Sequence, residues 1–147
     1  MTTGQIVLAV AVLLAVAFGA WRLLTDGRFR GTHKVHGGPE TDAHEPGVLD
    51  GSTIEHTLGE RATLVQFSSA FCAPCRATRR ILGEITGIVP GVEHVEIDAE
   101  HHLDLVRRLG IVRTPTTLVL DDRGREVTRA QGAPTKQQVL NALAAVD

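Results

Sequence analysis

An apolar run near the amino terminus limits most strongly what this chain of 147 residues can fold into. Residues 6–24 read IVLAVAVLLAVAFGAWRLL and carry a single charge, that of Arg22. About 20 apolar residues in a helix span the hydrocarbon layer of a bilayer, whereas a helix of a soluble core usually keeps a polar face. Trp21 and Arg22 lie where an interfacial anchor and a snorkelling cation would lie. We therefore predict a transmembrane helix over residues 4–24.

A cleaved signal peptide is the alternative explanation of this run. Residues 15–17, Ala-Val-Ala, resemble a cleavage site, but no lysine or arginine precedes the run, and a signal peptide needs a positively charged start. The basic residues follow it instead, at Arg22, Arg28, Arg30 and Lys34. By the positive-inside rule these charges favour a single-pass protein whose domain faces the cytoplasm, although the side of the membrane stays open.

The rest of the chain divides into two parts by composition. Residues 25–46 are rich in glycine, histidine and polar side chains and lack apolar periodicity, which predicts a flexible linker. Residues 47–147 alternate between short apolar runs and helical patterns, which predicts one α/β domain. The net charge of −2 gives no electrostatic reason to expect nucleic-acid binding.

Strand and helix patterns alternate along this domain. Apolar spacing, Thr135 as a helix cap and turn residues predict, in chain order, a strand at 62–68, a helix at 76–88, a strand at 92–97, a helix at 101–109, strands at 116–120 and 125–130, and a helix at 135–146. Crossover helices imply parallel pairing of the first strands, and a tight turn makes the last pair antiparallel. A further short edge strand is expected at 53–58. The expected fold is a central mixed sheet flanked by helices.

Cys72 and Cys75 are the only cysteines in the chain, and three explanations fit their spacing. A structural zinc ion needs about four ligands, and the second pair available, His101 and His102, points in different directions on a helix. A purely structural disulfide across two residues closes a tiny loop and constrains the unfolded chain little. A reactive dithiol is the third explanation and the one that we favour, so no metal ion is expected.

The position of the two cysteines supplies a mechanism for a reactive dithiol. Cys72 lies where a strand ends and a helix begins, and the free N–H groups and positive dipole end of that helix favour a thiolate. Pro74 fits the first helical turn, where its missing N–H is harmless. Cys75 lies one turn inside, where it can attack a mixed disulfide formed by Cys72, and Arg76 adds a nearby cation.

Residues 62–146 resemble the thioredoxin family. The resemblance rests on LVQFSSAFCAPC, on VEIDAEHHLDLVRRLGIVRTPTTLVLDDRGREV and on QGAPTKQQVLNAL. It implies a thioredoxin-like fold in which the proline matching Pro115 is cis and faces the cysteines, while Thr114 presents backbone groups to the substrate. The groove that the resemblance implies consists of Phe71, Ala73, Pro74, Thr114, Pro115 and Gly132.

The chain departs from the family's pattern around the cysteines. Phe71 replaces a tryptophan, which keeps an aromatic cover over the site, and Ala73 replaces a glycine. Gln66 and His94 stand where the family has a buried aspartate and its lysine partner, a pair thought to relay protons to the second cysteine. Glutamine cannot accept a proton at neutral pH, so we expect water or His94 to act as the base. Gln66, Arg76 and His94 are thus the residues expected to tune the dithiol.

These features together predict a membrane-anchored thiol–disulfide oxidoreductase that reduces protein disulfides through Cys72 and Cys75. Its expected partners are protein disulfide substrates, an electron-donating thiol system and the membrane, through residues 4–24. No bound cofactor is implied, because the electrons pass through thiols. Two alternatives stay open: a thioredoxin-fold interaction module without catalysis, and a dithiol oxidant whose domain faces outward.

Overall fold

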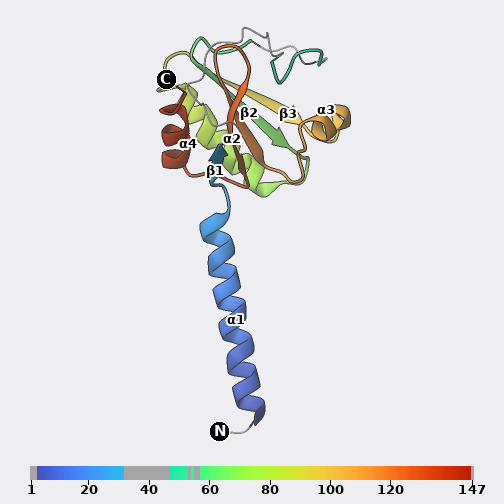
Figure 1. Ribbon diagram of the computed structural model, residues 1–147, viewed down its shortest axis with the longest axis vertical. Coiled ribbons are helices and arrows are strands. Elements are labelled where there is room, and N and C mark those ends of the chain that lie inside the picture. Colours follow the sequence, from blue (N-terminus) through green and yellow to red (C-terminus); the bar gives the residue numbers. More distant parts are fainter. Residues whose placement is uncertain (1–2, 32–46, 53, 55–56, 147) are drawn as a thin grey trace, which may run out of the picture.

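The computed structural model describes residues 3–31, 47–52, 54 and 57–146. A long amino-terminal helix leads into an α/β domain that stands at the end of this helix (Figure 1). Most of the expected linker, residues 32–46, lies outside the described residues, as do residues 53 and 55–56 of the expected edge strand. The remaining residues of that segment, Ile54, Thr57 and Leu58, are not in a strand.

The first helix, α1, spans Thr3–Thr25 and has no buried residue. It projects away from the domain (Figure 1), so the described part of the domain does not cover its aliphatic side chains. With 23 residues and a mean hydropathy of 2.4, α1 is long and apolar enough to cross a membrane, and an amino-terminal signal sequence would meet the same criterion.

The domain is built on one five-stranded sheet in the order β1-β5-β4-β2-β3. Its central strand β2 pairs in parallel with β3 and antiparallel with β4, and β5 joins β4 to the edge strand β1. The strands are β1 (Phe29–Gly31), β2 (Ala62–Ser68), β3 (Val92–Asp98), β4 (Thr116–Leu120) and β5 (Glu126–Gln131). The predicted bounds agree with these to within one residue for the four longer strands.

Helices cover both faces of the sheet. The remaining helices are α2 (Ala73–Thr86), α3 (Leu103–Arg108) and α4 (Lys136–Leu143). On one face, Leu64 of β2 packs with residues of α2 and α4, and on the other Phe67 of the same strand packs with Leu105 of α3. Every residue of β2 is therefore buried, which explains why its sequence is a short run of mostly apolar residues.

The beginning of the expected linker is an ordered part of the sheet, which corrects the prediction of a flexible segment from residue 25. β1 pairs antiparallel with β5, with Phe29 opposite Ala130 and Arg30 opposite Arg129. Phe29 is half-buried against the core beneath α2 and α4, while the flanking arginines are exposed. A three-residue strand with one inward side chain is too short to show alternation, so its sequence resembles that of a linker.

The pairing of β4 also differs from expectation, because β4 runs antiparallel to β2 rather than parallel. A parallel crossover must return the chain along the whole strand, about 23 Å for seven residues, and the six residues of α3 span only about 9 Å. The chain therefore enters β4 at the end of the sheet where β3 finished. The predicted parallel β2–β3 pair and antiparallel β4–β5 pair are confirmed.

The last helix begins where the sequence predicts it. The Thr135 hydroxyl accepts a hydrogen bond from the Gln138 backbone N–H, and the Gln138 side chain accepts one from the Thr135 N–H. This reciprocal capping box satisfies two donors that a helix start otherwise leaves unpaired.

Candidate active site

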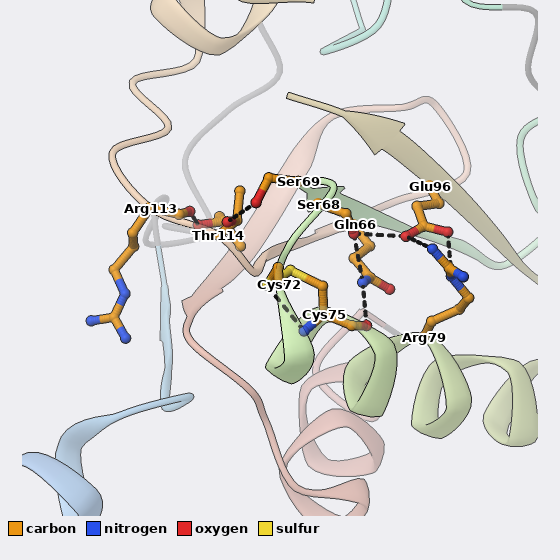
Figure 2. The surroundings of a disulfide bond; sticks show 10 residues. Gln66, Ser68, Ser69, Cys72, Cys75, Arg79, Glu96, Arg113 and Thr114 are labelled. Carbon is orange, nitrogen blue, oxygen red and sulfur yellow. Dashed lines mark hydrogen bonds and ion pairs between the residues drawn. A yellow bond between two sulfur atoms is a disulfide. The ribbon is translucent and has the colours of Figure 1, made fainter. Parts of the chain in front are cut away.

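Cys72 and Cys75 form a disulfide at the amino-terminal end of α2 (Figure 2). Cys72 is the capping residue of the helix, with extended backbone, and its Sγ accepts a hydrogen bond from the Cys75 backbone N–H at 3.1 Å. Pro74 lies in the first turn, as predicted. Cys72 is 9% exposed and Cys75 only 2%, so Cys72 is the more accessible of the two largely covered residues. The helix end thus directs an N–H group at the outer sulfur, which would favour its thiolate form after reduction.

A second loop, which carries Thr114 and Pro115, lies beside the segment that precedes Cys72. The Thr114–Pro115 peptide bond is cis, which confirms that expectation. The hydroxyls of Ser69 and Thr114 are 3.0 Å apart and share a hydrogen bond (Figure 2), and the Gly132 N–H donates to the Pro115 carbonyl at 2.8 Å. The structure therefore gathers Thr114, Pro115 and Gly132 near the disulfide.

The end of α1 reaches this same loop, a contact that the sequence does not reveal. Asp26, the first residue after α1, forms an ion pair with Arg113, directly before Thr114. The Asp26 carboxylate also lies against Gly132: a Cβ on that glycine would be 2.7 Å from it. Asp26 and Arg113 were not predicted as site residues, because a single aspartate in a polar segment 87 positions from its partner carries no recognisable pattern.

Gln66 lies fully buried beneath the first turn of α2. Its side-chain nitrogen donates to the Cys75 carbonyl at 2.9 Å and to the Ser68 hydroxyl at 2.8 Å (Figure 2). A buried amide would cost several kcal/mol without partners, so these contacts make its burial tolerable. Gln66 therefore contacts the backbone of Cys75 through a neutral amide, and no carboxylate stands at position 66.

His94 meets Gln66 from the neighbouring strand β3. Its Nε2 lies 3.2 Å from Gln66 Oε1, and because the Gln66 nitrogen faces two other acceptors, the amide oxygen must accept here. Nε2 therefore carries the proton. Burial lowers the pKa of His94 below its usual value despite the nearby Glu96 carboxylate, so the ring is neutral at neutral pH. In this state Nε2 has no free lone pair, and a proton could be accepted only at Nδ1.

Glu96 and Arg79 extend the same hydrogen-bond network toward solvent. The Ser68 hydroxyl donates to Glu96 Oε1 at 2.7 Å, and the Arg79 guanidinium donates to the same oxygen at 2.7 Å (Figure 2). Partial burial of Glu96 opposes ionisation, but hydrogen bonds from Arg79 and Ser68 and the Arg79 charge outweigh it and lower the pKa of Glu96. The sequence does not point to Glu96 and Arg79, because their roles depend on the register between β2 and β3.

The expected cation at Arg76 lies beside the disulfide. Arg76 is exposed on α2 and lines a cavity of about 400 Å³ together with both cysteines and Arg79. Within the described part of the chain Arg76 has no carboxylate partner, in contrast to Arg79, which pairs with Glu96. The cavity therefore has one unpaired positive group next to the sulfur atoms.

Phe71 does not cover the site, which corrects the expectation of an aromatic lid. Its side chain is completely exposed, although it immediately precedes Cys72, and Ala73 and Pro74 are exposed as well. The loop is joined to its neighbour through the side chain of Ser69, whose hydroxyl shares a hydrogen bond with that of Thr114. None of Phe71, Ala73 and Pro74 lines the cavity beside the disulfide, so the groove that they were expected to form with Thr114 stays a prediction.

No group of three or more potential metal ligands exists within the described residues. His101 Nδ1 and the Asp98 carboxylate share a hydrogen bond at 2.8 Å, while the His102 ring bonds the Asp98 carbonyl at 3.0 Å. Both rings therefore make contacts on their own loop.

The comparison with protein families agrees with this geometry. The family model described as Thioredoxin matches residues 48–145. The chain belongs to the thioredoxin family. A thioredoxin of Mycolicibacterium smegmatis is 29% identical over 106 residues, which cover 69% of this chain and 94% of that protein. Thioredoxin-2 of Pyricularia oryzae is 32% identical over 78 residues, which cover 52% of this chain and 45% of that protein.

Among curated relatives, the putative thioredoxin H10 of Arabidopsis thaliana is 27% identical over 84 residues, and 54% of its length is covered. The chain thus spans about half the length of several curated relatives that it matches. Among solved structures, thioredoxin F from spinach chloroplast has a TM-score of 0.53 at 22% identity, over 60% of this chain and 78% of that chain. The Nicotiana alata thioredoxin NaTrxh has a TM-score of 0.53 at 26% identity, over 58% and 73%. These similarities confirm the thioredoxin-like α/β fold.

Membership in the thioredoxin family favours a reactive dithiol over zinc ligands or a purely structural disulfide as the explanation of the cysteine pair. The Cys72–Cys75 disulfide lies at the start of α2, within the matched residues, and fits the CxxC site of the family, which supports the reactive dithiol. β1 lies outside the residues matched by the family model, so the edge of this thioredoxin sheet is completed by residues that follow α1 directly.

Proposed function

We propose that this chain is a membrane-anchored thiol–disulfide oxidoreductase that reduces protein disulfides. The observation that carries the proposal is the Cys72–Cys75 disulfide at the start of α2, with the Cys75 N–H directed at Cys72 Sγ. The relatives named thioredoxin support the activity, and α1, with its uncovered apolar side chains, supports the anchor.

Reduction proceeds in two exchanges between sulfur atoms. The Cys72 thiolate attacks one sulfur of the substrate disulfide, so that a mixed disulfide forms and the other substrate sulfur leaves as a thiolate. The Cys75 thiolate then attacks Cys72 Sγ, which releases the second substrate thiol and closes the Cys72–Cys75 disulfide. Two electrons pass to the substrate, and an external thiol reductant must restore the dithiol before the next cycle.

The substrate backbone is proposed to lie across Thr114, whose loop is joined to the Cys72 segment through Ser69. This arrangement would bring an extended peptide past the Cys72 sulfur. Phe71 supplies apolar surface at the rim without blocking the sulfur, because its side chain stands free.

The anchor determines which disulfides such an enzyme would reach. Asp26, the residue that follows α1, pairs with Arg113 and lies against Gly132. The end of the membrane helix is therefore in direct contact with residues at the proposed substrate groove. We therefore propose that its substrates are disulfides close to the membrane surface, and that the flanking arginines place the domain on the cytoplasmic side.

The test uses the full chain in nanodiscs with insulin as the disulfide substrate and a small dithiol as the electron source. The account predicts insulin reduction that disappears in Cys72→Ser, and a midpoint potential near the value of about −270 mV typical of thioredoxin. No reduction by the intact protein would support an interaction module instead. A midpoint near about −120 mV would make it an oxidant and contradict the proposed direction. Labelling of the two cysteines in intact cells with a membrane-impermeant thiol reagent tests the side of the membrane.

A further inference from the structure

A basic pocket lies at the junction between α1 and the sheet. It has a volume of about 500 Å³ and is lined by the last turns of α1, by β1 and by β5. Five arginines contribute to its wall: Arg22, Arg28, Arg30, Arg113 and Arg129. The pocket is separate from the cavity beside the disulfide, which is lined by other residues.

The walls of this pocket are held in fixed positions. Gly27 N–H donates to the Gln131 carbonyl at 2.8 Å, directly before β1 pairs with β5. Gly27 is buried at φ +72°, and a Cβ there would collide with the backbone of Ala133, so the chain turns tightly from helix to strand. Asp26 pairs with Arg113 on the opposite wall. The helix end and the sheet edge therefore form one preorganised frame.

The positive charge of the pocket exceeds the negative charge of its partners. Arg113 pairs with Asp26, and Arg129 forms a two-pronged ion pair with Glu126 at 2.5–2.6 Å. Arg22, Arg28 and Arg30 are exposed and have no carboxylate partner in the described part of the chain.

Two of the arginines face each other across the strands. Arg30 of β1 is directly opposite Arg129 of β5 in the antiparallel register. The Arg129 guanidinium is already held by the Glu126 carboxylate and the Leu109 carbonyl, so the uncompensated charge at this position is that of exposed Arg30, which a bound anion would neutralise. Guanidinium groups bind phosphate through two parallel hydrogen bonds, which makes phosphate the best-matched anion.

The expected position of the pocket relative to the membrane indicates the source of that phosphate. Trp21 lines the pocket and is exposed near the end of an apolar helix, which is where tryptophan marks the boundary between hydrocarbon and headgroups. Phospholipid phosphates lie at this same depth. A zwitterionic headgroup would bring its own cation against the arginines, whereas an anionic headgroup would not.

We propose that this pocket binds the phosphate headgroup of an anionic phospholipid and thereby fixes the orientation of the domain on the membrane. The proposal rests on the membrane anchor within the proposed function. Bound lipid would hold β1 and β5 against the leaflet, and the Asp26–Arg113 contact would pass this constraint to the loop of Thr114.

Trp21 provides the probe, because it is the only tryptophan in the chain. The full chain is placed in phosphatidylcholine nanodiscs that contain a small fraction of brominated phosphatidylglycerol or, in a parallel sample, brominated phosphatidylcholine. The proposal predicts stronger quenching of Trp21 by the anionic lipid, with a preference of about fivefold for each arginine that contributes. Equal quenching by the two lipids would overturn it.

The variant Arg28→Gln/Arg30→Gln should lose this preference, and the matched control Arg80→Gln/Arg107→Gln, on exposed parts of α2 and α3, should keep it. A preference unchanged in Arg28→Gln/Arg30→Gln would contradict the site.

Inorganic phosphate at constant ionic strength separates two sources of the anion. If free phosphate abolishes the lipid preference at millimolar concentration, the pocket is a site for a soluble phosphate and the lipid proposal is wrong. Flotation with vesicles and insulin reduction report on the proposed function independently. Loss of the lipid preference in a protein that still inserts and still reduces insulin would overturn this inference alone.

Discussion

The side-chain amide of Gln66 donates a hydrogen bond to the backbone carbonyl of Cys75 at 2.9 Å. The same nitrogen donates to Ser68, and the amide oxygen accepts from His94 Nε2. Gln66 therefore holds the first turn of α2 from below, and it does so as a neutral group. Cys75, the cysteine expected to resolve the mixed disulfide, is thus positioned by a hydrogen bond from Gln66. Gln66 provides it with no carboxylate.

Gln66→Asp should accelerate the resolving step of disulfide reduction. A carboxylate beneath Cys75 could take the proton of its thiol, which glutamine cannot do. The measurement is single-turnover resolution of a mixed disulfide by wild type and variant across a range of pH, and the gain should be most visible at low pH. Gln66→Asn, which shortens the side chain without adding charge, is the control. An unchanged or slower rate in Gln66→Asp would mean that water or another group already acts as base.

His94 should make the stability of the protein depend on pH in a defined window. Burial lowers the pKa of this ring in the folded state, whereas the unfolded chain titrates near 6.5. Between these two values the unfolded state binds more protons, so the free energy of unfolding rises with pH and is fully recovered above 6.5. Thermal unfolding of His94→Gln should lack this rise. Glu96 contributes separately and at lower pH, because its lowered pKa adds stability that is lost below 4.5.

A similar rise in His94→Gln would show that another group produces the dependence. The reductase rate of His94→Gln tests its chemical role at the same time. If Nδ1 is the proton acceptor, resolution should slow severalfold in this variant while the first attack by Cys72 is unchanged.

Gly132 and Asp26 should be energetically coupled although they are far apart in the sequence. Gly132 has φ +92°, and a methyl group added to it would lie 2.7 Å from the Asp26 carboxylate. Gly132→Ala should destabilise the protein by about 1–3 kcal/mol, through both backbone strain and this collision. Adding Asp26→Gly to the Gly132→Ala protein should recover the stability lost through the collision, but not the stability lost through backbone strain. Additive effects in the double-mutant cycle would contradict the packing of Asp26 against the groove.

Thr116 and Thr117 are adjacent on β4, and only the first should lose stability on replacement by valine. The Thr116 hydroxyl donates to the Arg113 carbonyl at 2.7 Å, so Thr116→Val should cost about 1 kcal/mol. The buried Thr117 hydroxyl has no hydrogen-bond partner among the described residues. Thr117→Val should therefore be neutral or stabilise by up to about 1 kcal/mol. Equal destabilisation in thermal unfolding would show that Thr117 has a partner.

The sequence predicts the main strands because their signals are local and strong. Residues 62–68 and 116–120 are short apolar runs, and both strands begin and end at the predicted residues. The reactive pair is equally clear, because a cysteine at the start of a helix and a second one turn later form a pattern that needs no distant contact. The same holds for Thr135, whose cap involves Gln138 three residues later.

Features that depend on distant contacts escaped prediction. β1 has one inward side chain, Phe29, and gains its pairing from β5 about 100 residues later. Asp26 obtains its role from Arg113, and Glu96 obtains its role from the parallel register that brings it to Ser68. The orientation of Phe71 also could not be read from its type, because the sequence shows an aromatic residue but not whether anything packs against it.

Trapping of a mixed disulfide tests the central claim most directly. The full chain in nanodiscs carries Cys75→Ser in one sample and Cys72→Ser in the other, and each is reduced, mixed with insulin and then quenched with an alkylating reagent. Mass analysis should find insulin joined to Cys72 in the Cys75→Ser protein and no adduct in the Cys72→Ser protein. Because Cys72 caps α2 and receives the Cys75 N–H, it is the sulfur expected to attack. Adducts only in the Cys72→Ser protein would reverse the two roles, and the absence of adducts from both would contradict a thiol–disulfide oxidoreductase.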